Sequence, residues 1–315
     1  MLPIRLKHAG FDWGSYPEFV GCSAALLAVT AHARQIAHSP APVLIHGESG
    51  TGKKLLARFI HWHSDRRGTA MLMLPCFGVS DAQLQDELFG VSRPVVQTAN
   101  MPHRGTFGEA VGSTLVLEEV GAMPLSLQER LLQELSSAPV KGPTYSTTSA
   151  PFLICTSTVS ISNLVQSGRF LPELAQRLEF NTLTMPPLRE RQEDILALAE
   201  HFLRTSRRGP MPTFSMDFVT GLERYEWPGN VNELAAAMRR IAYLTAEDVL
   251  TAIHLDLALP AHRSGLSLRE AERRLIESTL ASTSGNRTKT AEMLGVSVRT
   301  VRNKIREYGF PRRDA

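Results

Sequence analysis

"PVLIHGESGTGKKLLARFIHWH", residues 42–63, joins an apolar run, a glycine-rich loop and an amphipathic segment without a break. The apolar run has no polar alternation, which is typical of a strand covered on both faces of a sheet. The segment after the loop carries its apolar residues at helical spacing. A strand, a loop of the form GxxxxGK and a helix, in this order, are the context of a P-loop. The stretch therefore predicts a nucleotide-binding fold built on a parallel sheet.

Each part of the loop has a role toward phosphate. The glycines allow backbone angles in which successive N–H groups converge on phosphate oxygens, and the lysine reaches the β- and γ-phosphates. The general pattern continues with Ser or Thr to hold magnesium, and Lys54 stands at that position. A plain Gly-rich turn is the alternative, but strand, glycine spacing, lysine and helix agree on the P-loop. The expected nucleotide-binding residues here are Gly47, Glu48, Ser49, Gly50, Thr51, Gly52, Lys53 and Lys54.

A second signal follows about 65 residues downstream, where the apolar run TLVLEEV at 114–120 contains Glu118 and Glu119. A carboxylate at a strand end can hold magnesium directly or through water, and its neighbour can orient the attacking water. Acidic pairs at strand ends are also common surface features, so the preceding P-loop is what favours the functional interpretation. We expect both glutamates to be catalytic, with Glu118 as the ligand of Mg²⁺.

The alternation of apolar runs and amphipathic stretches continues to about residue 185 and predicts an α/β fold, a parallel sheet with helices on both faces. The runs that we expect to be strands are PVLIH, AMLML, TLVLEEV and FLICTST. After "MPPLRER" the pattern turns helical, in EDILALAEHFLRTS, FSMDFVTGLERYEW, NVNELAAAMRRIAYL and TAEDVLTAI, and an all-α C-terminal end follows. The expected segments are an N-terminal segment at 1–18, the α/β domain at 19–185, a helical domain at 186–255, a linker at 256–266 and a DNA-binding domain at 267–315.

Composition bounds the class of protein. The chain has 315 residues, 43% of them hydrophobic and 21% charged, which is ordinary for a soluble globular protein of about two domains. It has no apolar run of the length that a membrane helix needs, and its start has no secretion signal, so we expect a cytoplasmic protein without a membrane partner. Cys22, Cys76 and Cys155 are scattered, which argues against a disulfide framework and a zinc site.

Positive charge is concentrated at the C-terminal end. Residues 263–315 hold twelve Lys and Arg against six Asp and Glu, whereas the whole chain has a net charge of only +3. A bias of one sign at one end indicates an anionic partner, with nucleic acid first. A solvated basic surface is the alternative.

The C-terminal sequence "NRTKTAEMLGVSVRTVRNKIREYGF" predicts a helix-turn-helix. Ala291 lies four residues before Gly295, and apolar residues surround the turn. The second helix presents basic and amide residues on one face suited to phosphates and base edges in a major groove of double-stranded DNA. A basic surface helix pair is the alternative. The helix before this motif carries an apolar side that favours dimerisation. The expected DNA-binding residues are Arg299, Thr300, Arg302, Asn303 and Arg306.

Together these strings resemble the bacterial enhancer-binding proteins, the NtrC-like AAA+ activators that work with sigma-54 RNA polymerase. The resemblance spans nearly the whole chain and ends in a Fis-type helix-turn-helix. It implies ATP and Mg²⁺ as cofactors, DNA and RNA polymerase as partners, and self-association as a dimer or a larger ring. No receiver domain precedes the AAA+ module in this sequence, so we expect input from a partner, a ligand or expression level. The strings that carry the resemblance are FVG at 19, GESGTGK at 47, ELFG at 87, TLVLEEVGAMPLSLQERLL at 114, MPPLRERQEDI at 185 and WPGNVNEL at 227.

The chain departs from the family at the loop that contacts sigma-54. Where the family has GAFTGA, this sequence has PVVQTA at 94–99. Pro94 and the β-branched pair Val95 and Val96 stiffen the backbone and replace an exposed Phe-Thr tip. We expect impaired contact with sigma-54.

Departures also fall on the residues that the resemblance assigns to hydrolysis. Glu118 replaces the first Asp of the family's Asp-Glu pair, and Pro75 stands where an Asn switches the catalytic Glu. The resemblance also implies two arginines that each subunit contributes to the nucleotide site of its neighbour. Leu171 stands at the first position and Arg177 at the second. Arg177 is the third expected catalytic residue. Asn232 stands where the family has a sensor Arg that contacts nucleotide, and Thr158 stands where the family has an Asn after the third strand. At the position of Lys54, the family commonly has Glu.

The leading hypothesis is a DNA-binding transcription regulator with a nucleotide-binding AAA+ domain impaired in hydrolysis, which occupies DNA, contacts another polymerase form or joins an intact relative in a mixed ring. The second hypothesis is an active ATPase that remodels sigma-54 polymerase. A third, a P-loop enzyme that acts on small molecules, leaves the helix-turn-helix without a role.

Overall fold

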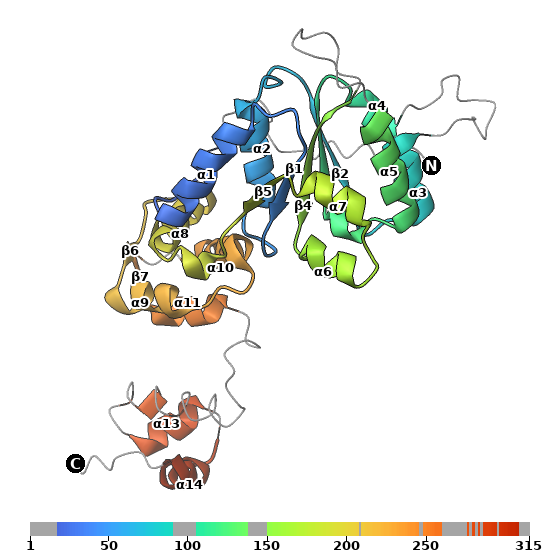
Figure 1. Cartoon of the computed structure of the whole chain (residues 1–315). Helices are drawn as coiled ribbons and strands as arrows, with labels where there is room; N and C mark the ends of the chain where they lie inside the picture. Colours follow the sequence, from blue (N-terminus) through green and yellow to red (C-terminus); the bar gives the residue numbers. More distant parts are fainter. Residues whose placement is uncertain are drawn as a thin grey trace, which may run out of the picture. The chain divides into compact units, whose positions relative to one another are not determined.

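The computed structural model describes residues 18–90, 105–137, 150–207, 209–245 and 248–259 and, near the C-terminus, 276, 279–280, 283, 286–294 and 296–308 (Figure 1). The sequence PVVQTA at 94–99 and most of the expected linker lie outside these ranges. The chain divides into two compact units, Met1–Leu255 and Asp256–Ala315.

The first unit contains a five-stranded sheet in which every pair of neighbouring strands is parallel. The order is β2-β3-β4-β1-β5, so the strand that leads into the P-loop lies between two others. The strands are β1 (Val43–His46), β2 (Met71–Pro75), β3 (Thr114–Glu118), β4 (Phe152–Ser157) and β5 (Asn181–Thr184). The first four coincide with the predicted runs. The edge strand β5 was not predicted, because its sequence NTLT has one apolar residue.

Helices cover both faces of this sheet. Alternate residues of β1 supply the two cores: Leu44 packs into one cluster, whereas Val43 and Ile45 pack into the other. One face is covered by α1 (Ala24–Ile36) and α2 (Lys53–His63). The helices of the other face are α3 (Asp81–Phe89), α4 (Gly105–Glu109), α5 (Leu125–Ser137), α6 (Ile161–Gln166) and α7 (Pro172–Leu178). Because both faces are covered, the strands read as apolar runs without alternation, and the predicted α/β fold is confirmed.

The strand-to-helix connections include two short 3-10 helices, η1 (Val120–Ala122) and η2 (Leu188–Glu190). The first directly follows the acidic end of β3. The second leads from the sheet into the helical lid. Both therefore lie beside elements that carry candidate site residues.

The lid consists of α8 (Glu193–Ser206), α9 (Met216–Arg224), α10 (Asn230–Leu244) and α11 (Ala252–Ala258). The prediction of a helix over 245–253 was wrong: β7 (Val249–Leu250) pairs with β6 (Thr213–Phe214) in a small parallel sheet, and α11 begins only at Ala252. Two residues of backbone pairing overrode the helical pattern there. The same helix continues through Ala258, so the first residues assigned to the linker are helical.

The second unit contains the predicted helix pair, α13 (Arg287–Met293) and α14 (Val298–Tyr308). Asn286 Oδ1 accepts the backbone N–H groups of Thr288 and Lys289, which caps α13. The Val296 N–H donates to the Ala291 carbonyl at 3.0 Å, a 6→1 bond that closes the turn after the helix. Buried Ala291 and Val301 join the two helices. The helix-turn-helix prediction is confirmed.

Within the described ranges, every helix is too short or too polar to span a lipid bilayer.

Candidate nucleotide-binding and DNA-binding sites

The P-loop runs from the end of β1 to the first residue of α2. Gly50 and Gly52 have φ angles of 78° and 107°, in the left-handed region that favours glycine. Gly52 is the N-cap of α2, and no side chain caps this helix. The backbone N–H groups of its first turn are therefore not taken by a capping side chain, and the positive end of the helix dipole lies at the loop. This arrangement fits a phosphate group.

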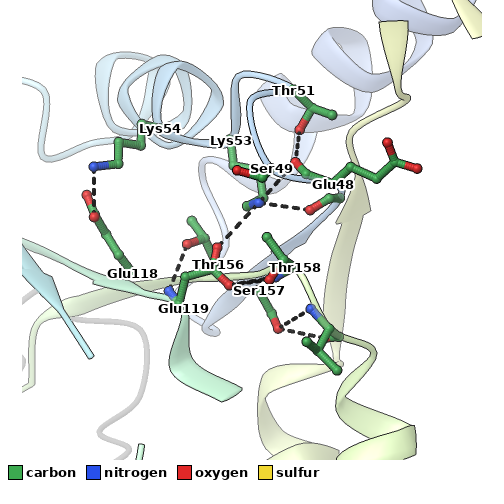
Figure 2. Close-up of polar contacts among 12 residues, drawn as sticks. Glu48, Ser49, Thr51, Lys53, Lys54, Glu118, Glu119, Thr156, Ser157 and Thr158 are labelled. Carbon is green, nitrogen blue, oxygen red and sulfur yellow. Dashed lines mark hydrogen bonds and ion pairs between the residues drawn. The ribbon is translucent and has the colours of Figure 1, made fainter. Parts of the chain in front are cut away.

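Lys53 points back into the loop. Its Nζ donates to the Gly47 carbonyl at 2.8 Å and the Glu48 carbonyl at 3.2 Å, and it lies 3.4 Å from Glu119 Oε1 (Figure 2). Burial lowers the pKa of Lys53, and the charge of Glu119 opposes that shift. The structure thus brings together the predicted P-loop lysine and one of the two predicted carboxylates.

Glu119 is held in a fixed position at the end of β3. Its backbone is left-handed, with φ and ψ both 54°. The Thr158 N–H and hydroxyl both donate to Glu119 Oε2 at 2.8 Å, and the Glu119 N–H donates to Thr156 Oγ1 at 3.1 Å. Thr158, at a position where the resemblance predicts Asn, therefore binds the predicted catalytic carboxylate.

Glu118 faces a different lysine. Its side chain is 8% exposed, and Oε2 lies 2.8 Å from Lys54 Nζ on the first turn of α2 (Figure 2). Pro75 is paired with Glu118 in the register of β2 and β3, and it lies at the end of the edge strand, where a residue without an N–H is tolerated. The residue expected to hold Mg²⁺ is thus already paired with a cation.

The lid contacts the P-loop through Glu48. Arg189 Nη1 and Nη2 donate to its two carboxylate oxygens at 2.9 and 2.6 Å, and Asn230 Nδ2 donates to Oε2 at 3.1 Å. The hydrogen bonds of Arg189, followed by that of Asn230, lower the pKa of Glu48 from 4.5 to about 2. Glu48 therefore acts as a link between loop and lid.

Asn230 and a further lid residue, Arg191, also contact the loop backbone. Asn230 is fully buried, with φ 52°; it donates to the Ser49 carbonyl at 3.0 Å and accepts the Leu188 N–H at 2.7 Å. Buried Arg191 donates through Nη2 to the Thr51 carbonyl at 2.7 Å. Each contact satisfies a carbonyl of the loop and ties the loop backbone to the lid.

Sequence reasoning did not single out these lid residues. Arg189 and Arg191 stand in the quoted string MPPLRERQEDI, and Asn230 stands in WPGNVNEL, but no role was assigned to them. The available signal was an Asn after Pro-Gly, which favours a left-handed backbone. The predicted residue Asn232 also lies here, since a side chain on Gly50 would contact its Cβ.

Arg177 lies apart from these contacts. It is on α7, where Nη1 donates to Ser136 Oγ of α5 at 2.9 Å. Leu171 is the N-cap of the same helix and packs against the core, while its N–H donates to buried Gln128 at 2.9 Å. Leu171, where the resemblance predicts an arginine, is therefore packed into the fold.

Metal fits this site less well than phosphate does. Among the described residues, no three His, Cys, Asp or Glu side chains gather in a metal-binding arrangement. Mg²⁺ is held by oxygen, above all by carboxylates, phosphates and water. Here the carboxylate of Glu118 is ion-paired, and the P-loop hydroxyl position is Lys54.

In the second unit, α14 carries the predicted DNA-binding residues. Thr300, Arg302 and Asn303 are exposed on it, whereas Val301 is 1% exposed and packs inward. The Thr300 hydroxyl is bonded to Ser297 Oγ at 2.8 Å, and Ser297 also caps the helix by accepting the Thr300 N–H at 3.0 Å. Thr300 therefore fixes the start of this helix. The backbones of Arg299 and Arg306 lie on the same helix.

Three parts of the chain match described families. Residues 19–184 match the Sigma-54 interaction domain, residues 189–271 match the AAA+ ATPase lid domain, and residues 267–308 match the bacterial regulatory proteins of the Fis family. With the P-loop sheet, the lid and the helix-turn-helix, these matches define a class, the AAA+ regulators that carry a Fis-type domain. The chain belongs to the family of sigma-54-dependent transcriptional regulators, and the resemblance inferred from the sequence is confirmed.

Individual relatives agree with this assignment. The chain is 33% identical to the transcriptional regulatory protein ZraR of Salmonella typhi, over 91% of this chain and 68% of ZraR. It is also 33% identical to the regulatory protein AtoC of Escherichia coli K12, over 95% of this chain and 69% of AtoC. Among solved structures, NtrX of Brucella abortus in complex with ATP has a TM-score of 0.66 and 26% identity, over 93% of this chain and 69% of NtrX.

Proposed function

We propose that this protein is a DNA-binding transcription regulator whose AAA+ domain binds ATP but is impaired in hydrolysis and in contact with sigma-54. The observation that carries the proposal is that both strand-end carboxylates are engaged by the chain's own donors. Lys54 pairs with Glu118, while Lys53 and Thr158 hold Glu119. The resemblance assigns an Asn that switches the catalytic Glu to the position of Pro75. Proline has no side-chain amide, so it cannot orient either carboxylate in this way.

Several observations support nucleotide binding. The P-loop glycines, the uncapped N-terminus of α2 and buried Lys53 form a cradle for phosphate. NtrX of Brucella abortus, which has the same fold, has been solved with ATP and with ADP. The residues that would hold ATP are Gly47, Glu48, Ser49, Gly50, Thr51, Gly52, Lys53, Lys54 and Asn232. Glu118, the residue predicted from the sequence to hold Mg²⁺, is ion-paired with Lys54 and is therefore not assigned a metal in this proposal.

The remaining roles follow from the family and from the second unit. We propose that the exposed residues of α14 bind double-stranded DNA, together with Arg299 and Arg306. We propose that Arg177 serves the nucleotide site of a neighbouring copy in a dimer or ring. RNA polymerase or an intact family member would be the protein partner, in the cytoplasm.

Turnover measured across protein concentration tests the proposal. We expect ATP to bind with dependence on Lys53, so that Lys53→Ala loses binding, and we expect phosphate release to stay slow as the concentration rises. A trans arginine contributes roughly 10³ to 10⁵ in rate where it acts. Fast release that increases with self-assembly would therefore contradict impaired hydrolysis and favour the active remodeller.

A further inference from the structure

The pair between Lys54 and Glu118 places a fixed positive charge beside the metal-binding carboxylate of the P-loop fold. Lys54 Nζ is 2.8 Å from Glu118 Oε2, within the range of a charge-assisted hydrogen bond. The Glu118 side chain is 8% exposed, whereas that of Lys54 is 64% exposed. A carboxylate this buried requires a counter-charge, and here the chain supplies it.

The geometry of the two lysines extends this observation. Lys53 and Lys54 are the first two residues of α2, and each is paired with one of the two strand-end carboxylates. An ammonium group has three N–H donors, so Lys54 can keep its bond to Glu118 and donate to a phosphate oxygen as well. Bridging a carboxylate and a phosphate is the task that a metal ion performs in such sites.

A magnesium ion at Glu118 would meet this ammonium. Mg²⁺ needs near-ideal octahedral oxygen coordination at about 2.0–2.1 Å, and a nitrogen cation on the same carboxylate oxygen takes one lone-pair direction and repels the ion. The metal therefore has to displace the Lys54 ammonium from the buried Glu118 carboxylate before it gains a ligand. Metal-free nucleotide has no such barrier, and its larger negative charge meets two lysines instead of one.

We propose that Lys54 takes the place of the metal at Glu118, so that this protein binds metal-free nucleoside triphosphate at least as well as the magnesium complex. The proposal rests on the proposed binding of ATP and goes beyond it, because it names the form of the nucleotide. It also gives one physical reason for slow hydrolysis, since phosphoryl transfer in this fold uses the metal to neutralise developing charge.

Binding of an N-methylanthraniloyl derivative of ATP to the full chain tests the proposal by fluorescence, in excess EDTA and in excess MgCl₂ at matched ionic strength. For the wild type we expect the two dissociation constants to agree within about threefold, since Lys54 supplies the counter-charge in both. For Lys54→Glu, which restores the residue common in the family, we expect binding at least about tenfold weaker in EDTA than in MgCl₂, because two carboxylates then face the phosphates.

Arg67→Glu is the matched control, because it makes the same change in charge at an exposed position beyond the C-terminal end of α2. This variant should keep the wild-type response to magnesium. Wild-type binding that weakens more than about threefold in EDTA overturns the inference and leaves the proposed function intact. Binding in neither condition overturns the proposed function and the inference together. The comparison of the wild-type dissociation constants in EDTA and in MgCl₂ decides the question by itself, so the test does not depend on whether a variant folds.

Discussion

Glu119 combines an unfavourable backbone conformation with a dense set of hydrogen bonds. A non-glycine residue in the left-handed region costs about 1 kcal/mol or more. The bonds from Thr158 to its carboxylate and from its own N–H to Thr156 offset that cost. The consequence is a carboxylate fixed toward Thr158 and Lys53, so Thr158 helps to set the orientation of the predicted catalytic group.

The three cysteines should differ sharply in reactivity. Burial, with the nearby charges of Glu118 and Glu119, raises the pKa of Cys76 to about 12, and burial raises that of Cys155 well above its usual value. Thiolate is the reactive form, and at about pH 8 it makes up about one part in ten thousand of a thiol with that pKa. Cys22 is exposed. We expect DTNB to titrate one thiol quickly in the native protein and all three after unfolding.

Cys22→Ser should remove the fast reaction without affecting the other two. The thiolate fraction of Cys76 should become large only as the pH approaches 12, so the slow phase should remain slow across the neutral range. Rapid modification of either remaining thiol in the folded Cys22→Ser variant would contradict the burial of Cys76 and Cys155.

Asn230 provides a test of strain against hydrogen bonding. Asn230→Ala removes three hydrogen bonds, those to Glu48, Ser49 and Leu188, and it keeps a φ of 52° that alanine disfavours. We expect it to lower the free energy of unfolding by about 3 kcal/mol. Asn230→Gly loses the same bonds but relieves the backbone, so it should cost about 1 kcal/mol less.

Urea unfolding followed by tryptophan fluorescence measures these changes, because all three tryptophans lie in the first unit. Asn232→Ala, at an exposed position two residues along α10, is the control and should change the free energy of unfolding by about 0.5 kcal/mol or less. Equal losses for the alanine and glycine variants would show that the left-handed backbone carries no cost here.

At the scale of elements, Glu48 couples the P-loop to the lid in a manner that depends on pH. Its pKa is depressed from 4.5 to about 2, so the stabilisation is fully present above pH 4.5 and is lost as the pH falls toward 2. The side chain is 43% exposed, so the contact with Arg189 contributes about 1 kcal/mol at most. We expect Glu48→Gln to lower the melting temperature by about 1–3 °C at neutral pH.

That difference in melting temperature should shrink as the pH falls from 4.5 toward 2, and calorimetry of the two proteins across this range measures it. Glu200→Gln, at an exposed carboxylate on α8, is the control and should match the wild type throughout. A difference for Glu48→Gln that stays constant down to pH 2 would contradict the assignment of the low pKa to this carboxylate.

Helix α14 should determine the salt dependence of DNA binding. Each phosphate contact by a basic residue contributes about 0.9 to the slope of log affinity against log salt. Arg302 is exposed on this helix, so Arg302→Ala should reduce the slope by about one such contact and weaken binding across DNA sequences. Fluorescence anisotropy with labelled duplex measures both quantities. Arg224→Ala, on α9 of the first unit, is the control and should leave the slope and the affinity unchanged. An unaltered slope for Arg302→Ala would show that Arg302 does not contact a phosphate.

The sequence predicted elements well where local pattern and packing agree. The bounds of α2, α8, α10 and α14 coincide with the predicted segments, because their apolar faces repeat at helical spacing. Strand β5 was missed, since an edge strand with one buried residue, Leu183, has no apolar run to detect. Strand β7 was taken for helix, because its pairing with β6 depends on a partner more than thirty residues away.

The same distinction applies to the site. The P-loop and the strand-end glutamates are contiguous motifs, so their residues were identified from sequence. The partners of these residues were not. Arg189, Arg191 and Asn230 reach the loop from the lid, about 140 to 180 residues along the chain, and Thr158 reaches Glu119 across neighbouring strands. The order β3-β4-β1-β5 brings the end of β3, the P-loop and the start of the lid together, and no local pattern encodes it.

At the scale of the whole molecule, the chain combines a nucleotide cradle in one unit with a helix-turn-helix in the other. The family resemblance places each active site between two subunits, with an arginine contributed by the neighbour. In this chain one such position is Leu171, packed against the core, and the other is Arg177. In the mixed ring proposed above, a subunit of this kind would affect two sites, its own and the one it completes.

A nucleotide site shared between two subunits predicts how total turnover depends on the composition of a mixed ring. If this protein joins an active, GAFTGA-bearing relative in mixed rings, a productive site needs an intact subunit and an intact neighbour, so total turnover falls as the square of the fraction of intact subunits. At equal amounts and constant total protein, we expect about a quarter of the turnover of the relative alone, because loss of a trans arginine costs roughly 10³ to 10⁵ in rate. Independent assembly would give about half. Phosphate release measured across mixing ratios distinguishes the two curves. A control protein that shares only the DNA-binding unit should follow the straight line, and a straight line for the full chain as well would exclude mixed rings of this kind.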